Sequence, residues 1–272
     1  MSRIEYKTRA QMGVMARAGV IVERALAAAR SAAIVGATTS EVEQAAASVI
    51  ADAGATSNFL GYEGFPATAC ISVNDEVVHG IPGSRVLAEG DVVSVDCGAI
   101  VDGWHGDSAV SFIVGTPLST RDEDLVAHTQ RALWAGIAAL SSARRVNDVS
   151  AAIEDVAREA SLHPIEGYVG HGIGTEMHQE PDVLNYRTRG RSAAVKPGMC
   201  VAIEPMFVQG TYLSSVLDDD WTVVSADGSR AAHWEHSIAV HDEGIWVLTA
   251  ADGGAAGLAE HGIVPVPPVS PR

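Results

Sequence analysis

The sequence predicts an α+β protein built from two similar halves. Two helical segments followed by strand-like runs occur before residue 115, and the same order occurs again after residue 120. Three pairs of matching residues lie 108 positions apart, namely Ser40 and Asp148, Gly90 and Gly198, and Asp96 and Glu204. With 272 residues, of which 47% are hydrophobic and 19% charged, the chain can form one large core or two modest ones.

Each half begins with two helices. Apolar periodicity predicts a helix over about residues 8–33 and a second one from Ser40, where Ser40 and Glu43 have the spacing of a capping box. Strand-like runs extend from Cys70 to Val114. In the second half we expect a helix over about residues 120–140, another from near Asp148, and strands from about 165 to 249.

Composition and charge exclude several classes of protein. The chain has 34 acidic and 18 basic residues, and its net charge of −16 would repel the phosphates of a nucleic acid. The N-terminus lacks a signal sequence, and no apolar run approaches the ~20 residues of a membrane span, so we expect a soluble cytoplasmic protein. The three cysteines, Cys70, Cys97 and Cys200, lie far apart in apolar stretches and are expected to be buried free thiols.

Two strands at matching positions end in an acidic residue. GDVVSVD runs from Gly90 to Asp96, and GMCVAIE runs from Gly198 to Glu204. Because side chains alternate along a strand, each acid follows a small residue, Ser94 or Ala202, on its own face. Two halves that face each other would bring these acids together.

A hairpin is predicted directly after the first of these strands. Asp102 and Gly103 form the commonest signal for a two-residue hairpin loop. With that loop, Gly98 pairs with Asp107, which places Asp107 on the same face as Asp96, one diagonal step or about 7 Å away. Two carboxylates at this spacing can reach a shared ion.

A fourth acid, Glu235, lies in the apolar stretch AAHWEHSIAV, residues 231–240. On a regular strand Glu235 shares its face with Ala231, His233, Ser237 and Ala239, while Trp234 and Ile238 face the other way. Each of the four acids alone is best explained as a loop cap or a solvated edge. Four on apolar strands are different, because clustered buried carboxylates cannot all ionise without cations.

The stretch GHGIGTEMHQEPDV, residues 170–183, carries His171 and His178 in a glycine-rich setting. Each glycine weakens a helix by about 1 kcal/mol relative to alanine, so a strand or a tight loop is expected. On a regular strand the two side chains would point to opposite faces and would have separate roles. The alternative is a glycine-bent connection with two ordinary histidines.

Four carboxylates and one imidazole form a hard, oxygen-rich set of donors. Such a set favours Mn, Fe(II) or Co(II) over a thiolate zinc site. The excess of carboxylates suits two ions about 3.5 to 4 Å apart, an arrangement used by phosphatases and aminopeptidases. From the residues alone we predict a dinuclear hydrolase, with phosphoesterase and peptidase both open.

Five motifs, SVNDEVVHGIP, GDVVSVDCGAIVDGWHGDS, GHGIGTEMHQEP, GMCVAIEPM and WEHSIAV, resemble those of type I methionine aminopeptidases in order and spacing, from about residue 5 to 250. The resemblance implies the pita-bread fold, with two pseudo-symmetric halves around a dinuclear site. It implies two divalent ions per chain (Co, Mn, Fe(II) or similar) on the ligands Asp96, Asp107, His171, Glu204 and Glu235, with Asp107 and Glu235 bridging. His105, which lies beside Asp107, matches no ligand of the family.

The same resemblance implies a reaction and a substrate. The enzyme would remove the N-terminal methionine from nascent polypeptides when the second residue is small, by attack of a metal-bridging hydroxide. Glu204 would carry the proton, His178 would stabilise the oxyanion, and His79 and His178 would contact the substrate. The methionine pocket would be formed by Phe59, Tyr62, Phe65, Cys70, Met177 and Trp221, although each could equally be core and the family more often has other residues in place of Phe59 and Met177.

The resemblance also indicates a subtype, the short bacterial form without an N-terminal extension. We expect one catalytic domain over residues 1–250, with halves at about 8–115 and 120–250, and a mobile or surface-draped tail over residues 251–272. The chain is too short for the extra N-terminal domain of prolidases and aminopeptidases P. We expect a monomer with a possible transient ribosome contact at the basic residues Arg187, Arg189, Arg191 and Lys196.

Two alternatives to this function stay open at the level of sequence. A non-catalytic binding protein can share the fold, but loss of metal ligands would mark it, and all five are present. Cleavage of a different N-terminal residue is the alternative within the same class.

Overall fold

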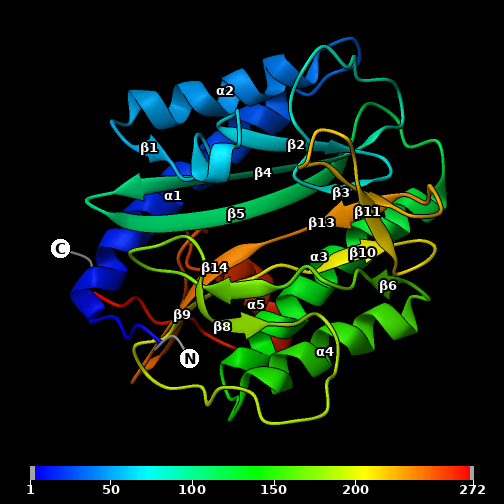
Figure 1. The fold of residues 1–272 in the computed structure, drawn as a ribbon. Coiled ribbons are helices and arrows are strands. Elements are labelled where there is room, and N and C mark those ends of the chain that lie inside the picture. Colours follow the sequence, from blue (N-terminus) through cyan, green and yellow to red (C-terminus); the bar gives the residue numbers. More distant parts are fainter. Residues whose placement is uncertain (1–3, 270–272) are drawn as a thin grey trace.

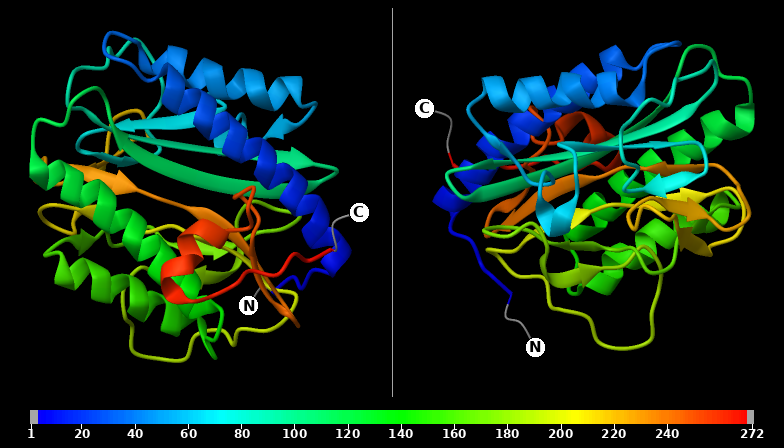
Figure 2. Two further views of the ribbon diagram at one scale, coloured as in Figure 1. Left: turned by 180° about the vertical axis from the view of Figure 1, so that it is seen from behind. Right: turned by 45° about the horizontal axis from the view of Figure 1, so that its top comes forward.

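The structure, a computed structural model, describes residues 4–269 and confirms the α+β class (Figure 1). Helices α1 and α2 cover one side of the molecule and α3 and α4 cover the other, with the sheets between them (Figures 1 and 2). Residues 1–3 of the predicted domain and residues 270–272 of the predicted tail lie outside the described part. Within that part, no helix is long and apolar enough to cross a membrane.

The first half consists of two helices packed on a sheet. Buried Val22 of α1 and Val42 of α2 form one core with Val93 and Val95 of β4. The sheet has the order β1-β4-β2, and β5 pairs with β4 along the whole length of both strands. The elements are α1 (Arg9–Ala32), α2 (Thr39–Asp52), β1 (Thr56–Ser57), η1 (Tyr62–Gly64), β2 (Ala69–Val73), β3 (Glu76–Val78), β4 (Val92–Val101) and β5 (Trp104–Ile113).

The second half repeats this plan with shorter strands. Leu133 of α3 and Ile153 of α4 share a core with Val201 and Ile203 of β9 and with Ile238 of β14. The five-stranded sheet has the order β15-β14-β9-β7-β8, and two three-stranded sheets are β13-β10-β6 and β11-β12-β3. The elements are α3 (Thr120–Leu140), α4 (Val146–Glu159), β6 (His163–Pro164), β7 (Gly170–Gly172), β8 (Gln179–Val183), β9 (Cys200–Ile203), β10 (Met206–Val208), β11 (Ser214–Val216), β12 (Val223–Ser225), β13 (Ala231–His233), β14 (His236–His241), β15 (Gly244–Val247), α5 (Ala255–Leu258) and η2 (Ala259–His261).

The helix boundaries confirm four predicted helices and correct one cap. Helix α2 is capped by Thr38, whose hydroxyl accepts from the Glu41 N–H at 3.2 Å, while the Glu41 carboxylate accepts from the Thr38 N–H at 2.7 Å. The capping box predicted at Ser40 and Glu43 is therefore wrong. Thr38, Thr39 and Ser40 follow one another in the sequence, and threonine and serine are both good N-cap residues.

The hairpin register is as predicted. Val101 pairs with Trp104 and Gly98 pairs with Asp107. Asp102 has φ 50° and Gly103 has φ 78°, the left-handed conformations that this turn needs at both central positions.

The two halves are joined by backbone and side-chain hydrogen bonds between β5 and residues 233–237. The Glu235 N–H donates to the Ala109 carbonyl at 2.9 Å, and the Ser111 hydroxyl donates to the His233 carbonyl at 2.7 Å. The strand predicted over residues 231–240 is interrupted here: β13 ends at His233 and β14 begins at His236. The chain leaves one sheet for another at this break, so the prediction of one regular strand was wrong.

The residues after Thr249 lie on the surface of the second half, as Figure 2 shows for the red segment. Leu258 of α5 is fully buried in the core of that half. Further along, the His241 ring bonds the Val266 carbonyl at 2.8 Å and Arg9 Nε donates to the Pro268 carbonyl at 2.6 Å. Of the two predicted alternatives, a surface-draped tail describes residues 251–269. The three cysteines are buried and free, as predicted.

Candidate active site

One cavity of about 310 Å³ lies where the two halves face each other. It is lined by all the residues to which the sequence assigned a role, namely Phe59, Tyr62, Phe65, Cys70, His79, Asp96, Asp107, His171, Met177, His178, Glu204, Trp221 and Glu235. They come from eight separate stretches of the chain, and the fold alone brings them together.

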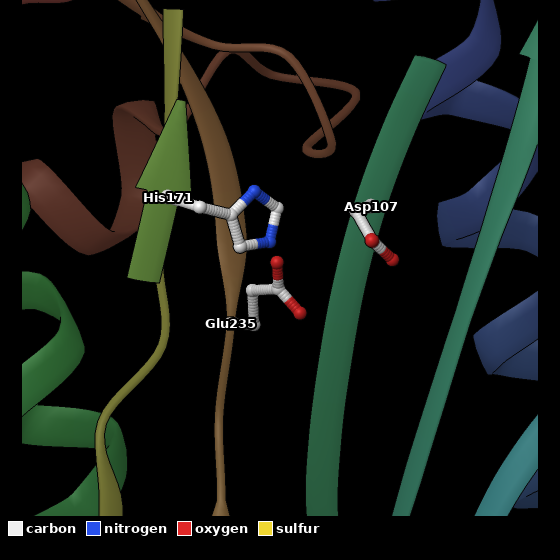
Figure 3. Close-up of side chains that lie close together, drawn as sticks. All are labelled: Asp107, His171 and Glu235. Atoms are coloured by element: carbon white, nitrogen blue, oxygen red, sulfur yellow. The ribbon is translucent and has the colours of Figure 1, made fainter. Parts of the chain in front are cut away.

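The deepest group in this cavity has the arrangement of a metal site. Ligand atoms of Asp107, His171 and Glu235 all lie within 4.8 Å of one another, and all three residues are buried. Figure 3 shows the Glu235 carboxylate between the imidazole of His171 and the carboxylate of Asp107. Glu204 adds an oxygen 3.3 Å from His171 Nε2, and Asp96 lines the same space.

Hydrogen bonds between the two halves hold Asp107 and Glu235 in place. The Asp107 N–H donates to the Ser237 hydroxyl at 3.1 Å, and that hydroxyl donates to the Asp107 carbonyl at 2.8 Å. Glu235 is fixed in the same way through Ala109. Asp96 and Asp107 are one diagonal step apart on the β4–β5 hairpin, because Asp96 pairs with Ala109 and Gly98 with Asp107.

Burial and mutual repulsion dominate the electrostatics of the four acids. Burial raises the pKa of Asp107 to about 7, and burial together with neighbouring carboxylates raises the pKa of Asp96, Glu204 and Glu235 well above the usual range. One oxygen each of Asp96, Asp107 and Glu235 has no hydrogen-bond partner among the described residues. Buried carboxylates without donors are compensated by cations, so the donor set fits divalent ions.

The tautomer of His171 supports the same conclusion. Its Nδ1 lies 3.0 Å from the Gly172 carbonyl, which can only accept, so Nδ1 carries the proton. Burial lowers the pKa of His171 to about 3, so the ring is neutral. The Nε2 lone pair then faces the Glu204 oxygen at 3.3 Å, and two acceptors at this distance are stable only with a proton or a metal ion between them.

His178 lies beside His171, not on an opposite face. Strand β7 ends at Gly172, the chain turns, and His178 returns immediately before β8, so the two ring centroids are 4.4 Å apart. The expectation from a regular strand was wrong, and the tight loop was correct. His178 Nδ1 lies 2.8 Å from the Tyr62 hydroxyl.

His79 lies at the other side of the cavity, directly after β3, with φ 60°. Its ring centroid is 5.8 Å from that of Tyr168 and 6.1 Å from that of Trp221. Burial lowers the pKa of His79 to about 4, so the ring is neutral and can donate only one hydrogen bond.

Next to the acids the cavity has an apolar wall. Phe59, Phe65, Cys70 and Met177 form one buried cluster, on which Tyr62 and Trp221 pack. Phe65 and Trp221 meet edge to face, with ring centroids 5.1 Å apart. All six residues predicted for the methionine pocket therefore lie together.

Sequence reasoning missed three polar residues of the cavity, His233, Tyr168 and the exposed Glu63. His233 is 1% exposed, its Nε2 has no hydrogen-bond partner in the described part of the chain, and it lies 3.7 Å from Glu204. Its position two residues before Glu235 was the available signal. No comparable signal pointed to Tyr168. The backbone N–H of His105 donates to the Gly174 carbonyl, and His105 does not line the cavity.

This fold with a carboxylate-rich cavity defines a metallopeptidase. The sequence model of metallopeptidase family M24 matches residues 13–242, and the chain therefore belongs to that family.

Comparison with individual proteins places the chain more narrowly. It is 49% identical over 253 residues to methionine aminopeptidase 1 of Mycobacterium tuberculosis, covering 90% of this chain and 95% of that protein. The crystal structure of methionine aminopeptidase from Thermotoga maritima matches with a TM-score of 0.87 at 39% identity, covering 92% of this chain and 99% of that one. Prolidase from Pyrococcus furiosus, at 19% identity and a TM-score of 0.72, covers 90% of this chain and 65% of its own, and shares the pita-bread fold. The chain is a methionine aminopeptidase of type I, a hydrolase that uses divalent metal.

Proposed function

We propose that this enzyme removes methionine from nascent polypeptides whose second residue is small, with two divalent ions held by Asp96, Asp107, His171, Glu204 and Glu235. One observation carries the proposal: Asp96, Asp107 and Glu235 each have one buried oxygen without a hydrogen-bond partner in the described part of the chain, and they line the same cavity as an apolar pocket suited to a methionine side chain. The family supports use of divalent metal.

The donor set favours a pair of Mn, Fe(II), Co(II) or similar ions. Asp107, His171 and Glu235, whose ligand atoms lie within 4.8 Å of one another, would hold the ions together with Asp96 and Glu204, which line the same cavity. When bound, the ions supply an activated water and polarise the carbonyl of the scissile bond.

His178 provides a hydrogen bond to the oxygen that develops charge. Burial raises the pKa of Tyr62, so its hydroxyl stays protonated and can donate to His178 Nδ1 at 2.8 Å. Burial lowers the pKa of His178, so its neutral ring then carries the proton on Nε2. That N–H is the donor we assign to the oxyanion.

Glu204 is the proton carrier. Its Oε1 faces His171, and its Oε2 lies 3.7 Å from His233. We assign to Oε2 the transfer of a proton from the attacking water to the leaving amine, because this oxygen is the one that does not face His171.

The pocket sets the specificity. The methionine side chain enters between Phe65, Trp221 and Tyr62, where apolar atoms remove it from water. The rings of Tyr168 and Trp221 lie beside His79, and we expect them to restrict the second residue to small types such as Gly, Ala or Ser.

We further propose a monomer that acts in the cytoplasm. A transient ribosome contact would depend on Arg189, Arg191 and Lys196, which are exposed. Arg187 contributes less than the sequence suggested, because it pairs with Glu154 and Asp155 at 2.7 and 2.6 Å. Charge reversal at the three exposed residues should weaken co-sedimentation with ribosomes, and unchanged co-sedimentation would refute the contact.

One experiment tests the metal dependence and specificity together. The enzyme is chelated, its metal content is checked, and turnover of Met-Ala-Ser and Met-Lys-Ser peptides is measured after addition of Mn, Fe(II), Co(II) or Zn. We expect no turnover without metal, recovery at two ions per chain, and cleavage of Met-Ala-Ser alone. Activity in metal-free enzyme would refute the dinuclear mechanism, and equal cleavage of both peptides would refute the specificity.

A further inference from the structure

We infer that Glu5 and Lys7, here called the N-terminal clamp, are positioning residues for His178. The inference rests on the proposed role of His178. The clamp acts on residues 174–179, here called the histidine loop, which lie about 170 positions away in sequence and carry Met177 and His178 into the cavity.

Glu5 holds the histidine loop at both ends. Its carboxylate accepts from the Thr175 N–H at 3.2 Å and the Thr175 hydroxyl at 2.9 Å, and from Gln179 Nε2 at 2.9 Å. Burial would raise the pKa of Glu5, but these bonds outweigh it and lower the pKa. The carboxylate is therefore charged, and its bonds are of the stronger, charge-assisted kind.

Lys7 holds the same loop through the side chain of Gln179. Its side chain is 1% exposed, and its ammonium donates to Gln179 Oε1 and to the Glu5 carbonyl, both at 3.0 Å, while lying 3.3 Å from the Glu5 carboxylate. Its own N–H donates to the Gly198 carbonyl at 2.7 Å, which ties the clamp to the residues before β9. A buried lysine is costly unless its three donors are used, and here each has an acceptor.

The loop approaches the clamp too closely for any side chain at Gly174. A Cβ there would lie 2.2 Å from a Glu5 oxygen and 2.3 Å from Lys7 Cε. The Gly174 carbonyl accepts from His105 of β5 at 2.9 Å. The loop is therefore fixed between the N-terminal segment and the first half.

Few other contacts among the described residues hold residues 175–178, the part of the loop that carries His178. Thr175, Glu176 and His178 are exposed, and within the loop Met177 provides the main apolar contact. Among the described residues, the His178 ring has one side-chain hydrogen bond, to the Tyr62 hydroxyl. Because an oxyanion donor must be placed within a fraction of an ångström, loss of the clamp should lower kcat through His178 without removing any ligand of the ions.

The test is a double-mutant cycle of Lys7→Met with His178→Ala, on enzyme loaded with Mn. Methionine matches the length of the aliphatic part of the lysine side chain and removes its charge. Alone, Lys7→Met should lower kcat on Met-Ala-Ser about tenfold; in the His178→Ala background it should add less than about twofold, since residues that act through one group are not additive. Arg9→Met is the matched control, because Arg9 belongs to the same segment but bonds Glu243 and Pro268, and should leave kcat unchanged.

Hydrogen exchange supplies a second measurement. Amides of residues 175–179 should exchange at least about tenfold faster in Lys7→Met than in the parent, while those of β14 stay unchanged. Glu5→Gln keeps the size of the side chain but removes its charge and replaces one acceptor oxygen with an NH2 group. It replaces Lys7→Met if the latter does not fold, and the same results are expected of it.

The outcomes separate the inference from the proposed function. A full loss of kcat that persists in the His178→Ala background, or a wild-type kcat in Lys7→Met, overturns the positioning role. If His178→Ala itself retains wild-type kcat, the proposed role of His178 fails, and the inference with it.

Discussion

Exchange of His178 and His171 for alanine, one at a time, should separate donation to the reaction from ligation of metal. In the described part of the chain, the contact of His178 with the donor set is with the ring of His171, at a centroid distance of 4.4 Å. His178→Ala should therefore keep close to two ions per chain. His171 supplies the nitrogen of the Asp107–His171–Glu235 group, so His171→Ala should lose metal and regain only part of its activity in excess metal.

The magnitude for His178 follows from its surroundings. Removal of one donor to an oxyanion costs about 10²- to 10³-fold in kcat, or about 2.7 to 4 kcal/mol. His178 lines the cavity but is exposed as a whole residue, so water can replace part of the lost bond, and we expect the lower end, about 10²-fold. KM should change much less, because the donor acts mainly in the transition state.

The assay combines elemental analysis with steady-state kinetics on Met-Ala-Ser. His261→Ala is a matched control, since His261 is an exposed histidine in η2 outside the cavity. Equal loss of metal in His171→Ala and His178→Ala, or a wild-type kcat in His178→Ala, would refute this division of roles.

Three further changes test other parts of the structure. Phe65→Ala, which removes a buried wall that meets Trp221 edge to face, should lower kcat/KM for Met-Ala-Ser about 10²-fold with unchanged metal content, and an unchanged kcat/KM would exclude Phe65 from the pocket. Burial lowers the pKa of His236 to about 4, so its neutral form stabilises the fold above pH 6.5 and this contribution is lost as the pH falls towards 4. Between pH 7 and pH 5 the wild type should thus lose about 2 kcal/mol more unfolding free energy than His236→Gln, as measured by urea denaturation, and parallel pH profiles would contradict this assignment. Addition of Mn to chelated enzyme at pH 7.5 should raise Tm, because ions relieve repulsion among the four buried carboxylates, and an unchanged Tm by calorimetry would speak against binding at these residues.

Local signals in the sequence predicted the parts of the site that depend on local structure. The register of the β4–β5 hairpin followed from Asp102 and Gly103 alone, and it placed Asp107 beside Asp96. The helices followed from periodicity, with the start of α2 misplaced because Thr38, Thr39 and Ser40 are all suitable caps. The identification of the family depended on motifs whose order and spacing span most of the chain.

Tertiary contacts determined what the sequence could not show. The strand is interrupted at Trp234 and Glu235 because the Glu235 backbone pairs with Ala109 of the other half. The sequence of residues 231–240 alone does not predict this interruption. Similarly, Glu5 and Lys7 look like ordinary charged residues near an N-terminus until the fold places the histidine loop against them.

The bonds that join the halves also set the order in which the enzyme can become active during its own synthesis. The Ser111–His233 and Asp107–Ser237 bonds connect residues 122 and 130 positions apart, so loop closure comes late and neither half can assemble the acids alone. Since Glu235 is translated after the other four proposed ligands, the chain must leave the ribosome past this residue before it acquires the ion site. A chain ending at residue 230 should accordingly bind no pair of ions in titration calorimetry, even where its α1–α2 half has folded.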